Sequence, residues 1–179
     1  MFDDRRSRRV VLVAHCVLNQ NTKLDGCAHY PGAMAEAVAE LVGSGVGIVQ
    51  LPCPELRCLG LDRQRAPGSR PSVAEEDTRI ARRMGEPAAR DACRALAGEV
   101  AREVEEYLRH GFEVVGLVGI DGSPSCAAHV TWREGVEAPG PGLFVEALER
   151  AVAGGLPKVG VRASDPATAR KAIRSLLRP

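Results

Sequence analysis

The chain has 179 residues, of which 45% are hydrophobic and 26% are charged, and its formal net charge is +1. This composition is typical of a globular protein with a real core, and the length favours one domain over two. The near-neutral charge and an aromatic content of 3% argue against a nucleic-acid polymer as a partner. Because no apolar run reaches the roughly 18 residues of a membrane span and no secretory leader is recognisable, we expect a cytoplasmic protein without a membrane partner.

Hydrophobic periodicity predicts strands and helices in alternation along the chain. Short apolar runs, rich in β-branched residues, are typical of strands buried on both faces, and amphipathic stretches indicate helices. The predicted strands cover 10–14, 46–51, 114–120 and 158–162, and the predicted helices cover 33–42, 88–110, 143–152 and 166–177. In the helix over 88–110, apolar residues stand at every fourth position from Ala92 to Leu108, and we expect this stripe to face the core.

Two long stretches between the predicted elements lack a clear hydrophobic period. Residues 17–31 contain several turn-forming residues and are predicted to form a loop. Residues 62–87 are polar, include three prolines and lack a sustained apolar period. We expect them to form a long loop or a partly helical insertion with a helix near 75–84, and loops of this length commonly cover a binding site.

The order of the elements predicts the fold class. Strands that alternate with helices build a mostly parallel sheet with helices on both faces, because right-handed crossovers place the helices there. We therefore expect an α/β fold, a three-layer sandwich with about four to five strands, in one domain over residues 1–179.

Three of the six cysteines lie a short distance after the ends of predicted strands. Cys16, Cys53 and Cys126 stand just beyond the first, second and third strand. Ligands bind outside the carboxyl ends of strands in open parallel sheets, so these three side chains are expected to converge. Cysteines of a cytoplasmic protein stay reduced, which makes them candidates for ligands, nucleophiles or small core residues rather than disulfides.

The residues alone leave several kinds of centre open. Three thiolates suit a catalytic metal with a vacant position or an iron–sulfur cluster with one iron that the protein leaves free, and His15 or His129 would complete a structural zinc site. A non-catalytic metal or sulfide-binding module would use the same cysteines. Alternatively, Cys126 would be a lone nucleophile activated by its loop and an adjacent helix terminus. No C-x-x-C pair and no glycine-rich nucleotide motif occurs.

Three blocks together resemble a known family. They are Cys16-Val-Leu-Asn-Gln-Asn-Thr-Lys-Leu-Asp-Gly26, Cys53-Pro-Glu55 and Ser123-Pro-Ser-Cys126, and in order and strand context they are similar to the signature blocks of the thiouracil desulfidase family. The blocks span roughly residues 10–130. The chain departs from the family pattern at Ala127, where glycine is usual, and before Ser123, where a basic residue is common, so it resembles a sister branch.

The resemblance implies an enzyme with an oxygen-sensitive [4Fe-4S] cluster held by Cys16, Cys53 and Cys126, whose fourth iron faces the substrate. The implied activity is removal of sulfur, without net redox change, from a thiolated small molecule such as a thiolated nucleobase or nucleoside. The expected partner is this small substrate, and a homodimer is left open. Cys58 is close enough in sequence to be an alternate ligand, whereas Cys27 and Cys93 have weaker claims, because burial on a helix as a small apolar residue is sufficient to explain Cys93.

The same resemblance implies catalytic roles for Glu55 and Ser123. Glu55 would carry a proton, and Ser123 would aim its hydroxyl at the substrate or the attacking water. Each also has a plainer interpretation, because Glu55 suits the start of a helical turn and Ser123 suits a turn around Pro124. Arg63 stands at a distance from Cys53-Pro-Glu55 where the family often has an arginine, which makes it a candidate for substrate binding.

Overall fold

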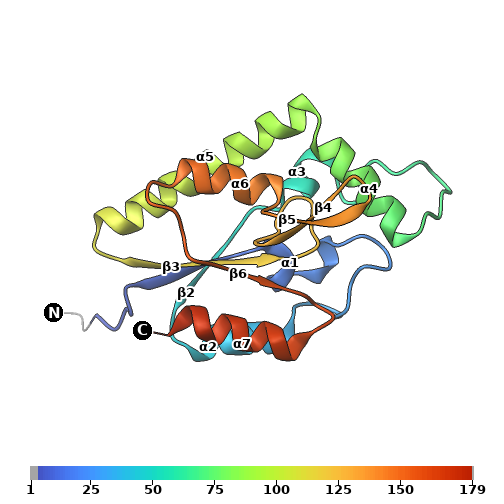
Figure 1. Ribbon diagram of the computed structural model, residues 1–179. Helices are drawn as coiled ribbons and strands as arrows, with labels where there is room; N and C mark the ends of the chain where they lie inside the picture. Colours follow the sequence, from blue (N-terminus) through green and yellow to red (C-terminus); the bar gives the residue numbers. More distant parts are fainter. Residues whose placement is uncertain (1–3, 179) are drawn as a thin grey trace.

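A four-stranded parallel sheet forms the centre of the computed structural model, which describes residues 4–178 (Figure 1). Its strands are β1 (Arg9–Val13), β2 (Gly47–Gln50), β3 (Glu113–Ile120) and β6 (Lys158–Val161), in the spatial order β2-β1-β3-β6. The two central strands, β1 and β3, are almost wholly buried, which explains their continuous apolar sequences. All four predicted strands are confirmed; of the predicted single domain over 1–179, residues 1–3 and 179 lie outside the described residues.

Helices cover both faces of the sheet. Helices α5 (Pro87–Arg109) and α6 (Leu143–Ala151) pack together on one face, and α2 (Ala35–Gly43) and α7 (Pro166–Leu177) pack together on the other (Figure 1). The buried apolar residues of the sheet and of both helical layers form one continuous core. The predicted three-layer α/β architecture is therefore correct.

The expected core stripe of α5 is confirmed in its middle and wrong at its ends. Val100 and Val104 are buried, whereas Leu108 is exposed and Ala92 is only partly buried beside the buried Cys93. An α-helix repeats every 3.6 residues, so a strict four-residue spacing winds around the axis and leaves the buried face. Small residues line this face because α6 lies against α5.

The polar segment 62–87 contains a helix, which confirms the expected partly helical insertion rather than a long loop. Helix α4 (Val73–Met84) begins at a capping box, in which the Ser72 hydroxyl accepts from the Glu75 amide and the Glu75 carboxylate accepts from the Ser72 amide. This reciprocal pairing satisfies two amides that the helix leaves free.

Several short elements were not predicted. They are α1 (His15–Leu18), which overlaps the start of the predicted loop, a 3-10 turn (Gln20–Thr22) inside that loop, α3 (Pro54–Leu59), and the antiparallel hairpin of β4 (Val130–Arg133) and β5 (Val136–Pro139). Elements of three to six residues carry too few residues to show a period. The hairpin turns at Glu134 and Gly135, which both have positive φ, as a tight hairpin requires.

The connections that follow β1 and β3 diverge to opposite faces of the sheet. The chain that leaves β1 continues to α2 on one face of the sheet, and the chain that leaves β3 continues through the hairpin to α6 on the other face (Figure 1). Neighbouring strands whose connections diverge in this way create the usual ligand site of such folds. Within residues 4–178, no helix is long and apolar enough to cross a membrane.

Candidate functional site

A cavity of about 390 Å³ lies at the carboxyl ends of the strands. It is lined by residues that follow every strand of the main sheet, including Cys16 after β1, Cys53 after β2, Cys126 after β3 and Ala163 after β6. A volume of this size accommodates a small molecule. The parallel sheet therefore brings segments that are distant in the sequence to one site.

Cys16, Cys53 and Cys126 all line this cavity, and none of them forms a disulfide. Burial raises the pKa of Cys16 to about 12, and it raises the pKa of Cys126 well above the ordinary thiol value. Cys53 and Cys16 also raise the pKa of Cys126. Because the three thiols line the same cavity, they lie at one edge of the sheet, as their positions after the strands predicted.

Helix α3 orients Cys53 and Glu55. Pro54 occupies the first turn of the helix, where a missing amide hydrogen has no cost, and the Cys53 sulfur accepts from the Leu56 amide at 3.4 Å. Cys53 therefore stands at the N-cap, and Glu55 lies in the first turn. The interpretation of Glu55 as a charge at the start of a helical turn agrees with this position.

The loop that carries Cys126 is built around the Ser123 hydroxyl. This oxygen accepts from the Ser125 amide at 3.2 Å and from the Cys126 amide at 3.0 Å. The backbone of the loop also lies directly against Gly142, where an added Cβ would come within 2.4 Å of the Ser125 carbonyl carbon. Ser123 is therefore a turn former, and it places Cys126 at the cavity.

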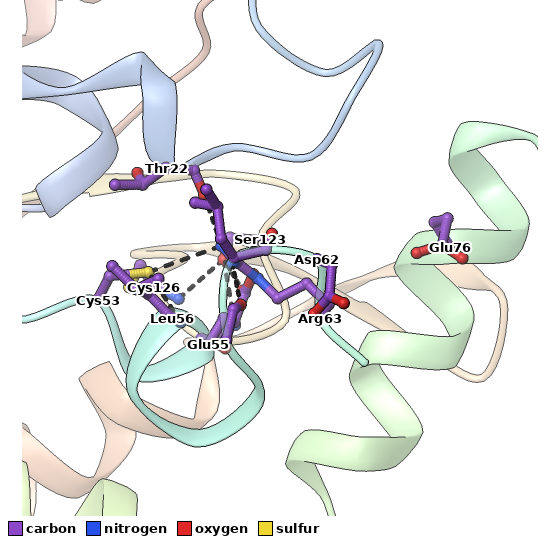
Figure 2. A network of polar contacts seen from close by, with 12 residues as sticks. Thr22, Cys53, Glu55, Leu56, Asp62, Arg63, Glu76, Ser123 and Cys126 are labelled. Atoms are coloured by element: carbon purple, nitrogen blue, oxygen red, sulfur yellow. Dashed lines mark hydrogen bonds and ion pairs between the residues drawn. The ribbon is translucent and has the colours of Figure 1, made fainter. Parts of the chain in front are cut away.

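A polar network connects the proposed catalytic residues (Figure 2). One oxygen of Glu55, Oε1, accepts from the Ser123 hydroxyl at 3.4 Å, and the other, Oε2, accepts from Nε of Arg63 at 3.4 Å. Glu55 is 16% exposed and lines the cavity, as does Ser123. The structure thus places the two residues beside each other and beside two of the cysteines, Cys53 and Cys126 (Figure 2).

Arg63 is the buried centre of this network, with 2% of its surface exposed. Its guanidinium donates to the carbonyl oxygens of Gly60 and Thr22, both at 2.6 Å, and lies 3.9 Å from the Cys53 sulfur. The residue has a φ of 55°, which is unfavourable for any side chain larger than glycine and persists only where surrounding contacts impose it. These protein contacts occupy its donors, so Arg63 holds the site together rather than offering free donors to a substrate.

The centres that the sequence left open make different demands on the arrangement of the ligands. Among the described residues, no three His, Cys, Asp or Glu side chains are grouped to hold a metal ion. A cluster makes a different demand, because each thiolate binds a different iron and the sulfur atoms surround a volume instead of a point. Three free thiols from three strand ends around one cavity fit that demand.

Only some of the other candidate ligands line the cavity. His15 and Cys27 line it, whereas His129, Cys58 and Cys93 are not among its lining residues. Cys93 is buried in the core on α5, and the ring of His129 lies near the Lys158 carbonyl at 3.3 Å. Cys27 thus lines the cavity although the sequence favoured it less as a ligand, and Cys58, which the sequence favoured more, does not line it.

The neighbouring helix terminus does not activate Cys126. The first amides of α6, at Leu143 and Phe144, donate to the carbonyl oxygens of Pro124 and Ser125, both at 3.0 Å. These amides are therefore not available to the Cys126 sulfur, and burial raises the pKa of this thiol. The helix terminus thus supplies no activation of Cys126 in this arrangement.

Sequence reasoning missed part of the cavity wall. Asp77 of α4, Trp132 of β4 and the ion pair of Glu137 with Arg162 line the cavity. Trp132 and Glu137 lie on the hairpin that was not predicted, and no sequence motif identifies Asp77 or Arg162 as part of a site. The single tryptophan of the chain was the one available signal.

Comparison with known proteins yields an archaeal relative. The chain is 32% identical to "Uncharacterized protein MJ0003" of Methanocaldococcus jannaschii over 121 residues, which are 68% of this chain and 69% of that protein. No protein-family model matches the chain, and no solved structure matches it.

Proposed function

The chain belongs to the same protein family as MJ0003 of Methanocaldococcus jannaschii, and we propose that it is an enzyme that removes sulfur from a thiolated small molecule. The substrate class that we propose is a thiolated nucleobase or nucleoside. The cofactor would be a [4Fe-4S] cluster held by Cys16, Cys53 and Cys126. This proposal also places the chain in a sister branch of the thiouracil desulfidases.

One observation carries the proposal. The three cysteines line a single cavity together with Glu55 and Ser123, although these five residues come from the ends of three different strands. A structural role alone does not require thiols, a carboxylate and a hydroxyl to meet at the same small-molecule cavity. The wall thus combines soft ligands for a metal with groups able to hold and move a proton.

The proposed reaction is a hydrolysis. When bound, the cluster supplies a Lewis-acidic iron that draws electron density from the C–S bond of a thiocarbonyl. Oxygen of water forms a bond to the thiocarbonyl carbon, the C–S bond breaks, and sulfur leaves as hydrosulfide. One proton of the water goes to the sulfur and the other is released to solvent, so the atoms and charges balance with one water molecule, and no electron donor or acceptor is needed.

The residues of the chain supply the proton transfers. Glu55 takes a proton from the attacking water and returns one to the departing sulfur, while the Ser123 hydroxyl fixes one oxygen of this carboxylate. Arg63 fixes the other oxygen and therefore acts as a positioning residue. Because the two carboxylate oxygens have different partners, the orientation of Glu55 is set before the substrate arrives.

The cysteines provide the first test. Protein that is purified and reconstituted without oxygen should contain iron and acid-labile sulfide in equal amounts, and it should release hydrosulfide from 4-thiouracil or 4-thiouridine. Cys16→Ala, Cys53→Ala and Cys126→Ala should each lose the visible absorption of the cluster together with the activity, because each removes one ligand. Cys58→Ala is the matched control, since Cys58 lies outside the cavity, and it should retain both.

Other results would reject the proposal in distinct ways. Metal uptake without turnover of any thiolated base would favour a storage or sensing module. Activity of iron-free protein that is blocked by alkylation would favour a cysteine nucleophile. Glu55→Gln should keep the cluster and reduce turnover by about 100-fold or more, and an unchanged rate would remove Glu55 from the mechanism.

A further inference from the structure

Four carboxyl groups line the cavity, and one of them has no partner. The Glu55 carboxylate accepts from Ser123 and Arg63, Asp121 accepts from three backbone amides, and Glu137 pairs with Arg162. Asp77 is partly buried on α4, and no hydrogen bond or ion pair connects its side chain to any residue in 4–178. An acceptor in such a place is left for a ligand to satisfy.

Asp77 lies in poorly solvated and negatively charged surroundings. Burial and then the charge of Glu55 raise the pKa of Asp77 to about 6, the charge of Lys23 lowers it, and the charge of Glu76 raises it. Lys23 also lines the cavity and offsets part of the negative charge there. The N–H group of a neutral ligand would satisfy the carboxylate oxygens without adding a further charge to the cavity.

Trp132 adds a flat surface to the same wall. Its indole Nε1 donates to the Thr78 hydroxyl at 3.1 Å, and Thr78 follows Asp77 directly on α4. This bond connects the β4–β5 hairpin to α4, which lie side by side (Figure 1). Since the polar edge of the indole is already occupied, Trp132 contributes an apolar ring to the cavity, and rings of this kind bind planar molecules.

We propose that Asp77 and Trp132 recognise a planar nitrogen heterocycle, in which a ring N–H next to the thiocarbonyl donates to the Asp77 carboxylate while the ring contacts Trp132. This inference rests on the proposed function for the thiocarbonyl, and it narrows the substrate to thioamide-type rings with a free N–H. Thiones that are alkylated at that nitrogen would be poor ligands.

Binding can be tested without any cluster, because Trp132 is the only tryptophan and its fluorescence reports on the cavity. Uracil serves as the probe, since it keeps the ring N–H groups, and its N1,N3-dimethylated form serves as the matched ligand. Wild-type protein should bind uracil about tenfold or more tightly than dimethyluracil, and Asp77→Ala, which leaves no acceptor at this position, should lose most of this preference. Asp91→Ala, at an exposed carboxylate of α5, should behave as wild type.

Turnover supplies the second readout. With 4-thiouracil, Asp77→Ala should raise KM about tenfold and leave kcat nearly unchanged, whereas a purely structural role would lower the fraction of active protein. Equal binding of the two probes by wild-type protein, no binding of either, or unchanged discrimination in Asp77→Ala would overturn the inference. If reconstituted wild-type protein releases no hydrosulfide but still discriminates between the probes, the proposed reaction is wrong and the recognition site stands.

Discussion

Ser123 makes two kinds of hydrogen bond, one that belongs to its structural role and one that belongs to its proposed catalytic role. Its oxygen accepts from two amides of the Cys126 loop, and its hydrogen points to Glu55. Ser123→Ala should therefore reduce the cluster content as well as turnover, because two loop amides lose their acceptor at about 1 kcal/mol or more each. Iron analysis and thermal unfolding of the variant measure the two effects.

Ser125 provides the matched control for Ser123. Its hydroxyl is buried without a hydrogen-bond partner among the described residues, so Ser125→Ala removes an unsatisfied group and should leave cluster content and stability unchanged or slightly higher. If the two serine variants lose iron equally, the hydroxyl of Ser123 does not organise the loop.

Asp77 should leave a signature in the pH dependence of stability. Its pKa is raised from 3.8 to about 6 in the folded protein by burial and by Glu55 and Glu76, against the opposing charge of Lys23. The folded state therefore binds more protons than the unfolded state between about pH 4 and pH 6, and stability falls as pH rises through this window. Asp77→Asn should raise Tm at pH 8 and leave it nearly unchanged at pH 4, and an equal shift at both would contradict this account.

At the scale of elements, α6 and the Cys126 loop are packed backbone against backbone. Gly142 has an ordinary φ of −71°, so alanine is not excluded by backbone conformation. Its Cβ would nevertheless come within 2.5 Å of the Ser125 oxygen and 2.8 Å of the Cys126 nitrogen. Gly142→Ala should therefore destabilise the fold by about 1–3 kcal/mol and lower cluster content, because the loop must move away. Chemical denaturation and iron analysis measure both effects.

Gly43→Ala is the matched control for Gly142→Ala, because it adds the same methyl group at a position without close neighbours. Gly43 ends α2, and an added Cβ would have no atom within 4 Å. Gly43→Ala should leave cluster content unchanged and should stabilise the protein slightly, since alanine restricts the unfolded chain. Equal losses in the two glycine variants would show that close packing of the Cys126 loop is not the cause.

Across the whole molecule, the proposed cluster would connect the ends of three of the four parallel strands. A ligand that binds only the folded state stabilises it by mass action, so anaerobic reconstitution should raise Tm by about 5 °C or more for a chain of this size. Calorimetry of the protein before and after reconstitution measures this shift. A variant that carries Cys16→Ala, Cys53→Ala and Cys126→Ala should show none, and a shift of equal size there would place the bound iron elsewhere.

Local sequence patterns are sufficient for the parts of this fold that contain enough residues to show a period. The buried strands β1 and β3 consist of continuous β-branched and aliphatic runs, and α7 begins at Asp165, whose carboxylate accepts from the Thr168 amide. The β4–β5 hairpin has strands of four residues and escaped prediction for that reason. The predicted stripe of α5 is buried at Val100 and Val104 and leaves the core at Leu108, because a four-residue spacing does not follow the helical repeat.

By itself, the sequence determined the alternation of strands and helices and the positions of Cys16, Cys53 and Cys126 after three strands, because these are properties of neighbouring residues. The parallel arrangement then implied that the three cysteines share one edge of the sheet. Only the tertiary structure decided that Arg63 is buried among Glu55, Cys53 and Thr22, and that Asp77 joins the cavity wall. Such contacts depend on how loops and an inserted helix pack across large sequence distances, which no local period encodes.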